Sequence, residues 1–391
     1  MGRIAIIGGG AAGLMAAVFA AKSDNEVVIL EKNPRFGRKI LASGNGRCNF
    51  TNINASYPYY NHPDFIERAL NKFGVRKTLD FFENSGLMYV VDDEGRAYPR
   101  SYSSSTVLNL LLNELNKPNV TLMPDKEVTG ISIKGEKFAL SCGGEIQADR
   151  VIITVGSRAG LKSGDTAGIV RDLGIRVTPL YPALAPLITS KEVVKGLSGI
   201  RVKGRISLIN NGVTVYSETG ELLFKDDGLS GIAVFNASLF MRRLKGVFEI
   251  SIDLLPEMSK ESIKQRFNAL KLPVKRFLDG IFLSKISDKI IMQASSSSID
   301  DIAGAVKDLR FTVLDTYGFD SAQVCHGGVD ISEINPETME SKRIKGLYFA
   351  GEIIDIDGEC GGYNLQWAWT SGAIAGFYSS VRQDSGELTC G

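Results

Sequence analysis

The stretch Ile4-Ala5-Ile6-Ile7-Gly8-Gly9-Gly10-Ala11-Ala12-Gly13, followed by Val27-Val28-Ile29-Leu30-Glu31, decides the fold. The apolar run before Gly8 predicts a short buried strand, and the small residues after it predict a helix over residues 11–22. The apolar run that ends at Glu31 predicts a second strand. A strand, a helix and a strand within about 30 residues form a right-handed βαβ unit.

The glycine spacing in this unit is that of a dinucleotide fingerprint. Gly8 permits the tight turn, Gly10 lets the backbone approach a pyrophosphate, and Gly13 lets the helix pack on the strand. The helix N-terminus supplies free N–H groups and a positive dipole end. Glu31 lies where a carboxylate accepts hydrogen bonds from a ribose. The unit therefore predicts a dinucleotide site, although the same fingerprint serves NAD and FAD.

A second glycine-rich segment, GRKILASGNGRCNFTN over residues 37–52, follows the second strand directly. Its glycines allow backbone N–H groups to point at a phosphate or a ring, and Arg38, Lys39 and Arg47 can neutralise a pyrophosphate. This composition suits an extended ligand and favours FAD over NAD. The alternative interpretation is a solvated basic loop.

A third glycine cluster lies in residues 346–368. It predicts a strand, an acidic glycine loop and a helix that begins near Asn364, so that a helix N-terminus can face the N1–C2=O edge of a flavin. Asp355, Asp357 and Glu359 suggest a calcium loop as an alternative, but their spacing lacks the EF-hand pattern. We therefore expect no metal.

Together the three strings resemble the bacterial flavoprotein family that includes BaiN and aminoacetone oxidase. The resemblance covers the whole chain, because Val151–Gly156, Ser163–Thr166 and Tyr181–Leu187 also match family segments in the right order. The chain departs from the family at Leu223–Gly231, LFKDDGLSG, where the family tends to read LFTH before the glycine-leucine-serine-glycine turn. Any role of that threonine and histidine is in doubt here.

The resemblance implies non-covalently bound FAD and a set of contacts to it. The expected FAD-binding residues are Gly8, Gly10, Ala12 and Gly13 at the pyrophosphate, Glu31 and Lys32 at the adenosine ribose, Arg38, Lys39, Ser43, Gly44, Arg47 and Asn49 along the flavin side, Val128 at the adenine, Thr154 and Gly156 after the strand that passes the nucleotide, Gly351 and Glu352 at the ribityl chain, and Gly362, Asn364 and Gln366 at the flavin ring.

The expected fold is α/β, a Rossmann-like FAD-binding domain with an inserted β domain and a small helical domain. Residues 1–186 and 306–391 are expected to form the FAD-binding domain, residues 187–255 the β-rich substrate domain and residues 256–305 the helical domain. Residues 57–115 are expected to be mostly helical with a break at Tyr98-Pro99, and residues 127–133 to form a strand that contains Val128.

The composition limits which classes of binding partner and which cellular compartment are expected. The chain has 391 residues with 45 Lys+Arg and 44 Asp+Glu, and this balance offers no bulk attraction for nucleic acid or an anionic membrane. The uncharged run over residues 4–21 is interrupted by glycines and predicts no membrane span. Five cysteines, Cys390 among them, form no CxxC pair, so neither a disulfide framework nor a zinc site is expected, and the cytoplasm is the expected compartment.

The catalytic residue is not identified from the sequence, because the flavin carries the redox chemistry and the protein positions the substrate. His62 and His326 are the two histidines, and Cys48 and Tyr363 flank expected flavin contacts; each also has a purely structural interpretation. Trp367 and Trp369 are expected in the core.

The function hypothesis is an FAD-dependent oxidoreductase for a small organic substrate. The resemblance implies NAD(P)H-linked reduction of a ketone or enone, or alternatively oxygen-dependent oxidation of an aminoketone. No second GxGxxG motif appears at domain spacing, so NAD(P)H, the candidate electron donor, would dock without a Rossmann domain of its own. A flavin-binding protein without turnover is a third hypothesis, and a tRNA-modifying flavoprotein would need a basic surface that the charge of +1 does not offer in bulk. No pattern specifies the oligomeric state.

Overall fold

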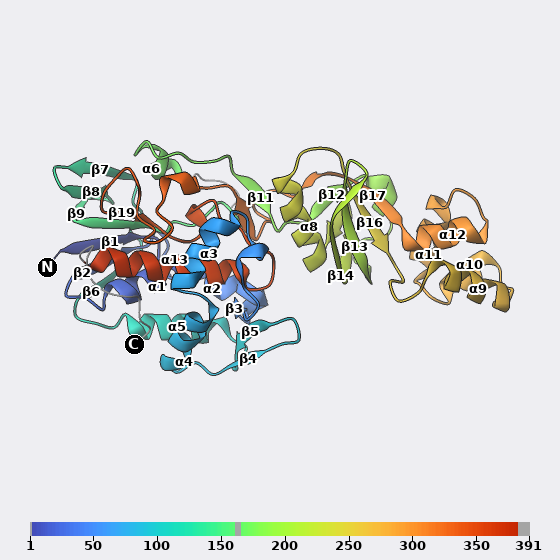
Figure 1. Cartoon of the computed structure of the whole chain (residues 1–391), viewed down its shortest axis with the longest axis horizontal. Coiled ribbons are helices and arrows are strands. Elements are labelled where there is room, and N and C mark those ends of the chain that lie inside the picture. The colour runs from blue at the N-terminus through green and yellow to red at the C-terminus, as the bar shows by residue number, and fades with distance from the viewer. Residues whose placement is uncertain (1, 161–165, 382–391) are drawn as a thin grey trace. The chain divides into compact units, whose positions relative to one another are not determined.

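The computed structural model describes residues 2–160 and 166–381 (Figure 1). Positions 163–165 of the Ser163–Thr166 motif, and Cys390, lie outside these residues. The chain divides into two compact units, Met1–Leu180 with Val324–Gly391 (unit 1) and Tyr181–Gln323 (unit 2). Each unit is described by itself.

Unit 1 is built on a five-stranded parallel sheet with the strand order β19-β10-β1-β2-β6. Its strands are β1 (Arg3–Ile7), β2 (Glu26–Leu30), β6 (Val120–Met123), β10 (Arg150–Ile153) and β19 (Leu347–Phe349). Nearly every residue of the three central strands is buried, as in parallel sheets covered on both faces. Because all strands run the same way, the segments after Ile7, Leu30, Ile153 and Phe349 emerge at one edge of the sheet.

Two helices, α1 (Ala11–Ala20) and α13 (Tyr363–Ser380), lie side by side against this sheet (Figure 1). Glycines on α13 make the contact possible: a Cβ atom on Gly372 would lie 2.5 Å from the carbonyl oxygen of Ala12, and one on Gly376 would lie 2.1 Å from that of Ala16. Trp367 and Trp369 of α13 are buried, which confirms that they belong to the core. The close approach joins the two ends of the chain in one nucleotide-binding unit.

The remaining elements of unit 1 surround this centre. They are α2 (Arg38–Ala42), η1 (Ser43–Gly46), β3 (Thr51–Asn52), η2 (Tyr57–Tyr59), α3 (Pro63–Lys72), α4 (Val75–Asn84), β4 (Tyr89–Val91), β5 (Arg96–Pro99), α5 (Ser104–Glu114), β7 (Gly130–Lys134), β8 (Lys137–Ser141), β9 (Glu145–Ala148), α6 (Gly168–Arg171), β18 (Val324–His326), η3 (Ile331–Glu333) and η4 (Gly351–Ile353). Residues 57–115 are mostly helical, as expected, in η2, α3, α4 and α5, and the break expected at Tyr98-Pro99 is the strand β5, which pairs with both β3 and β4. Val128 precedes β7 rather than lying within a strand.

Unit 2 contains a closed six-stranded barrel with the strand order β12-β15-β14-β13-β16-β17. Its elements are β11 (Tyr181–Ala183), β12 (Leu187–Thr189), α7 (Lys191–Val194), β13 (Arg201–Asn210), β14 (Val213–Lys225), β15 (Gly228–Ser230), α8 (Ile232–Arg243), β16 (Phe248–Asp253) and β17 (Leu309–Thr316). The alternation predicted for the strands is present: Phe248, Ile250 and Ile252 are buried, whereas the residues between them are half-buried.

Four helices lie between β16 and β17 in the chain, α9 (Lys260–Leu270), α10 (Val274–Asp279), α11 (Ser284–Gln293) and α12 (Ile299–Lys307). Ser298 caps α12 by accepting a hydrogen bond from the N–H of Asp301 at 3.1 Å. The buried side chains of the helices belong to the same apolar core as those of the barrel.

The expected return to the FAD-binding domain at residue 306 differs from the structure. β17 pairs with β12 on one side and β16 on the other, so residues 309–316 close the barrel, and the chain remains in unit 2 up to Gln323. Unit 1 likewise ends at Leu180, before the expected boundary at residue 186. Barrel closure joins segments far apart in the sequence, which hydrophobic patterns alone do not reveal. Within the described part of the chain, no helix is long and apolar enough to cross a bilayer.

Candidate functional site

The turn after β1 is shaped by glycines that the fold itself requires. Gly8 has φ +107°, and a Cβ atom there would lie 2.5 Å from the carbonyl oxygen of Thr154. The Thr154 hydroxyl donates to the carbonyl oxygens of Ile7 and Gly8, at 3.0 and 2.7 Å. A Cβ on Gly13 would lie only 1.9 Å from the carbonyl oxygen of Gly8. Thr154 therefore contributes to the site by holding the turn from the neighbouring strand.

Gly10 differs from these glycines because no described protein atom lies within 4 Å of where its Cβ would be. It precedes the first turn of α1, which no side chain caps, so the first N–H groups of the helix are available to an anion. Ala12 is buried, and a Cβ on Gly351 would lie 2.8 Å from the Ala12 Cβ. The open side of Gly10 fits the approach of a pyrophosphate.

Glu31 is buried at the end of β2 and fixes the loops around it. Its carboxylate accepts hydrogen bonds from the N–H groups of Gly9 and Asn33, both at 2.8 Å. Two carboxylate oxygens have about four acceptor positions, so a ribose hydroxyl can bind as well. Lys32 is exposed, and Arg38 donates to the Asn33 side chain at 2.6 Å.

The loop after α2 contains exposed Gly44 and Arg47 and half-buried Ser43, whose hydroxyl donates to the Ile40 carbonyl oxygen at 2.7 Å. Cys48 is fully buried, and burial raises the pKa of its thiol to about 11 despite a hydrogen bond with Ser43. The thiol is protonated near neutral pH and is a poor nucleophile. The space-filling interpretation of Cys48 is therefore favoured over a redox role.

Asn49 provides a direct test of whether a cofactor fits this site. Its side-chain oxygen is buried and has no hydrogen-bond partner among the described residues, and a Cβ on Gly362 would lie 2.8 Å from it. An unpaired buried acceptor costs about 1–3 kcal/mol. A ring N–H donor such as that of a flavin would satisfy it, so the residues present fit the expected cofactor.

Lys39 and Glu352 join two of the glycine-rich segments. The Lys39 Nζ lies 2.6 Å from a Glu352 carboxylate oxygen and 3.4 Å from the Ser157 hydroxyl. A Cβ on Gly156 would lie 3.8 Å from the same Glu352 carboxylate. The ends of β10 and β19 and the start of α2 therefore meet at one place, although the sequence separates them widely.

The N-terminus of α13 forms the opposite part of the site. Gly362 has φ +103° and precedes the helix, which no side chain caps. The Asn364 amide exchanges hydrogen bonds with the backbone of Gly358, at 2.9 and 2.8 Å, and so shapes the acidic glycine loop. The positive dipole end of this helix is suited to an electron-rich ring edge.

Gln366 does not offer its side chain to this site, contrary to expectation. The side chain is fully buried, and its amide is hydrogen-bonded to Thr51, Thr78 and Thr370 at 2.6–3.0 Å. It belongs to the core beneath the helix, because Gln366 follows Asn364 by two residues and therefore points to roughly the opposite side of α13. Val128 is also buried.

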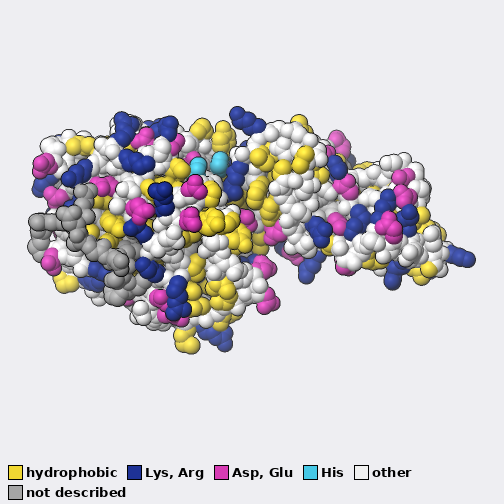
Figure 2. Space-filling model, viewed as in Figure 1, with side chains coloured by type: hydrophobic (Ala, Val, Ile, Leu, Met, Phe, Trp, Pro, Cys, Tyr) yellow, Lys and Arg dark blue, Asp and Glu magenta, His cyan; other side chains and the backbone are white. Residues whose placement is uncertain are grey.

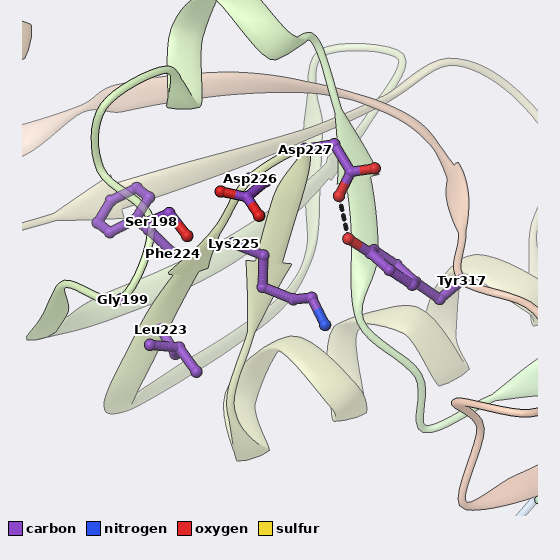
Figure 3. A pocket seen from close by; sticks show the side chains of 8 residues that line it. All are labelled: Ser198, Gly199, Leu223, Phe224, Lys225, Asp226, Asp227 and Tyr317. Carbon is purple, nitrogen blue, oxygen red and sulfur yellow. Dashed lines mark hydrogen bonds between the residues drawn. The ribbon is translucent and has the colours of Figure 1, made fainter.

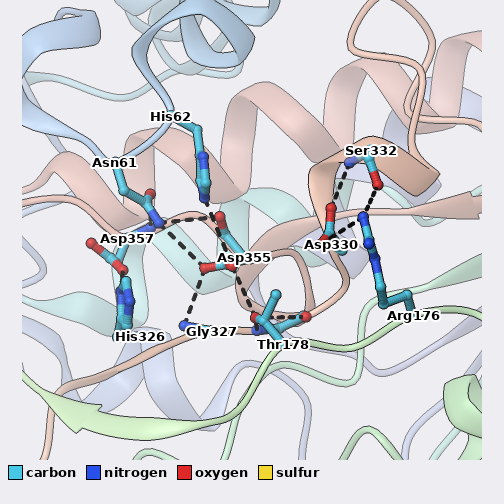
Figure 4. A network of polar contacts seen from close by, with 11 residues as sticks. Asn61, His62, Arg176, Thr178, His326, Gly327, Asp330, Ser332, Asp355 and Asp357 are labelled. Atoms are coloured by element: carbon cyan, nitrogen blue, oxygen red, sulfur yellow. Dashed lines mark hydrogen bonds and ion pairs between the residues drawn. The ribbon is translucent and has the colours of Figure 1, made fainter. Parts of the chain in front are cut away.

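A polar network lies beside the acidic glycine loop (Figure 4). His326 Nδ1 lies 2.6 Å from an Asp357 carboxylate oxygen, and Asp355 accepts from the Gly327 N–H at 3.1 Å and from the Thr178 hydroxyl at 2.9 Å. His62 Nε2 lies 3.7 Å from Asp355, so this histidine is joined to the network rather than standing on the surface. No sequence signal indicated these pairings, because most of the partners are far apart in the chain.

The same network contains three potential metal ligands. Ligand atoms of His326, Asp355 and Asp357 lie within 4.8 Å of one another. Both Asp355 oxygens already accept hydrogen bonds, however, and Asp357 is paired with His326. The three residues are organised as hydrogen-bond partners, and nothing in their arrangement requires an ion.

Unit 2 carries a separate hollow at the β14–β15 turn, with a cavity volume of about 490 Å³ (Figure 3). Its lining includes the KDD segment that departs from the family pattern. Lys225 Nζ lies 4.5 Å from the centre of the Tyr317 ring, and the Tyr317 hydroxyl donates to Asp227. Burial and Asp227 raise the pKa of Tyr317. The KDD residues that depart from the family pattern are thus part of a polar cluster at the β14–β15 turn.

The parallel sheet, the glycine turn and the two uncapped helix N-termini define a Rossmann-type dinucleotide-binding protein. Residues 2–378 match the family model described as "HI0933-like protein Rossmann domain", and the chain belongs to this family.

Relatives extend over nearly the whole chain. The chain is 37% identical to a 3-dehydro-bile acid delta(4,6)-reductase from Clostridium scindens, over 98% of this chain and 100% of that protein. It is 32% identical to a ribosomal RNA dihydrouridine synthase from Escherichia coli, over 94% and 95% of the two chains, and 31% identical to the protein of that name from Haemophilus influenzae, over the same shares.

Among solved structures, 3-ketosteroid delta1-dehydrogenase from Sterolibacterium denitrificans shares the fold with a TM-score of 0.52 at 12% identity, covering 97% of this chain and 100% of that one. The chain is an FAD-dependent oxidoreductase of this fold.

Proposed function

We propose that this enzyme reduces a carbon–carbon double bond conjugated to a carbonyl group in a small organic substrate, and that NAD(P)H supplies the electrons. FAD, when bound, supplies the hydride that such a reduction needs. The protein positions the cofactor and the substrate, excludes water and provides a proton.

One observation carries the proposal: relatives named for different substrates share one reaction type. The first name denotes a reductase for delta(4,6) double bonds in a 3-oxo bile acid. The other denotes synthesis of dihydrouridine, in which the double bond of a uracil ring beside a carbonyl is saturated. Both reactions add two electrons and two protons across a conjugated double bond.

The chain's own residues would hold the cofactor from two sides. The N-terminus of α1 would bind the pyrophosphate, with Lys39 nearby as a counter-charge. The N-terminus of α13 and the unpaired oxygen of Asn49 would bind the polar edge of the flavin ring. The sequence has a single dinucleotide fingerprint, so NAD(P)H would bind only transiently.

Anaerobic rapid mixing tests the proposal in two steps. NADH or NADPH should bleach the absorbance band of the oxidised flavin, and a 3-oxo steroid with a conjugated double bond should restore it. The saturated 3-oxo steroid is the matched control and should restore nothing. Bleaching by an aminoketone without nicotinamide would contradict the proposal and indicate the oxygen-dependent oxidase instead.

A uracil in ribosomal RNA is the second candidate substrate, and the relatives at 32% and 31% identity favour it. Basic and acidic side chains are intermixed on the face of the molecule drawn in Figure 2, without a basic stripe across it. Dihydrouridine in ribosomal RNA should be the same in cells with and without this chain if the substrate is a small molecule. A loss of dihydrouridine on deletion, restored by the intact gene, would establish the RNA instead.

A further inference from the structure

We propose that His326, held by Asp357, delivers the proton that completes this reduction. The inference rests on the proposed function and assigns a role to a pair that the cofactor does not use. A double bond that accepts a hydride at one carbon needs a proton at the other, and no residue has so far been assigned to that step.

The geometry of the pair is that of a general acid, His326, whose ring is held in one orientation by Asp357. His326 Nδ1 lies 2.6 Å from the Asp357 carboxylate, whose side chain is 1% exposed, whereas the His326 side chain is 21% exposed. A buried carboxylate favours the tautomer with the proton on Nδ1 and stabilises the imidazolium. With Nδ1 bound to Asp357, proton exchange with another group proceeds through Nε2.

Separate hydrogen bonds position both partners (Figure 4). The Asp357 N–H donates to the Asn61 side-chain oxygen at 2.8 Å, and the Asn61 N–H donates to the Asp357 carbonyl oxygen at 3.1 Å. On the other side, the N–H of Gly327, directly after His326, donates to Asp355 at 3.1 Å. The backbone on each side of the pair is therefore fixed independently of the contact between them.

The pair also lies next to the residues expected to hold the cofactor. Burial raises the pKa of Cys325, the residue before His326, and its thiol is hydrogen-bonded to Ser157. Ser157 in turn lies 3.4 Å from Lys39 Nζ. Asp357 lies between Glu352 and Gly362 in the chain, within the loop that joins two expected contacts. Asp357 directly precedes Gly358, whose backbone exchanges hydrogen bonds with the Asn364 amide, an expected flavin-ring contact, so the His326–Asp357 pair is attached to the loop expected beside the ring.

The proposed step balances without a further reactant. FAD, when bound and reduced, would supply a hydride for the β-carbon of the substrate, where the π bond breaks and its electron pair moves onto the carbonyl as an enolate. The N–H bond at His326 Nε2 then breaks, and that proton forms the C–H bond at the α-carbon. NAD(P)H, the reductant named in the proposed function, would restore the two electrons, while the neutral imidazole regains a proton from solvent.

The central experiment compares the two half-reactions in His326→Gln and Asp357→Asn. Reduction of the flavin by NAD(P)H should stay within about twofold of wild type, whereas reoxidation by the conjugated steroid should slow by about 100-fold in His326→Gln, since general acid catalysis contributes about 10²–10⁴. Asp357→Asn should slow the same half-reaction. Ferricyanide, which takes electrons and needs no proton at carbon, should reoxidise all variants alike.

His62→Gln is the matched control, because His62 contacts Asp355 rather than Asp357. It should leave both half-reactions within a few-fold of wild type. The chain has two histidines, so this variant also assigns the NMR signals of protein labelled with ¹⁵N-histidine. In the cofactor-free protein, neutral His326 should show the Nδ1–H tautomer, and Asp357→Asn should abolish that preference.

The outcomes separate this role from the proposed function. If conjugated steroids do not reoxidise the reduced wild-type enzyme, the proposed function fails, and the role of His326 fails with it. If they do, but His326→Gln is equally fast, only the role of His326 is overturned. A parallel loss of FAD content and of both half-reactions in His326→Gln would also overturn it, because that result describes a structural residue.

Discussion

Unit 1 and unit 2 differ in how much of their polar sites can be predicted from short stretches of sequence. In unit 1, glycines occur where a side chain would collide with backbone, as at Gly8 and Gly13, and the open position at Gly10 faces a helix N-terminus. In unit 2, a continuous apolar core closes a barrel, and the polar cluster around Tyr317 is assembled from separate strands. The glycine turns of unit 1 can be predicted from consecutive residues, whereas the polar cluster of unit 2 depends on tertiary structure.

The largest expected effect concerns two glycines of the same turn. Gly13→Ala should lower the melting temperature and abolish FAD binding, because its Cβ would lie 1.9 Å from backbone. Gly10→Ala should fold normally, since the space around it is open, but should bind FAD at least about tenfold more weakly because the pyrophosphate must approach there. Thermal unfolding of the apoprotein and flavin fluorescence titration distinguish the two. Normal FAD affinity in Gly10→Ala would contradict the expectation that the pyrophosphate approaches the backbone at Gly10.

Two asparagines near the site should respond in opposite ways. Asn49→Leu should leave the free energy of unfolding of the apoprotein nearly unchanged, because its oxygen is unpaired, yet weaken FAD binding by about tenfold. Asn61→Leu is the matched control: both ends of its amide are hydrogen-bonded, so it should destabilise the apoprotein by about 1–3 kcal/mol. Urea unfolding without FAD, paired with FAD titration, measures both. Equal destabilisation by the two changes would argue against a cofactor contact at Asn49.

Asp355 should make unit 1 sensitive to acid. Burial alone raises the pKa of Asp355, but hydrogen bonds from His62 and Thr178 and the charge of His326 outweigh it, and the net pKa lies below the ordinary value. A depressed folded-state pKa stabilises the protein above the unfolded pKa, and this contribution is lost as the pH falls below about 4. Asp355→Asn should be less stable at neutral pH and lose less on acidification, measured by urea midpoints across pH. The control Asp24→Asn, at an exposed residue, should leave the dependence of the urea midpoint on pH as it is in the wild type.

The smallest effect is expected in unit 2. Tyr317→Phe removes the hydrogen bond to Asp227 and should lower the free energy of unfolding by about 1 kcal/mol without changing FAD content. Chemical denaturation and flavin absorbance provide the two measurements. A loss of FAD in this variant would contradict the expectation that a change in unit 2 leaves the cofactor site of unit 1 unaffected.

The predictions from sequence succeeded where the cause was local. The βαβ unit was recognised from apolar spacing, and the helix N-termini from adjacent glycines. They failed where the cause was a distant partner: β5 was missed because its pairing with β3 and β4 is tertiary, and Gln366 faces threonines brought together from several elements. The pairing of His326 with Asp357 belongs to the same group.

By itself, the sequence determined the class of protein, because the stereochemistry of glycine and the start of a helix depend on a few consecutive residues. Only the tertiary structure decided that β17 closes the barrel, that Asn49 has an unpaired oxygen and that Asp357 orients His326. Burial and hydrogen bonding depend on which distant segments meet, and that information is distributed over the whole chain.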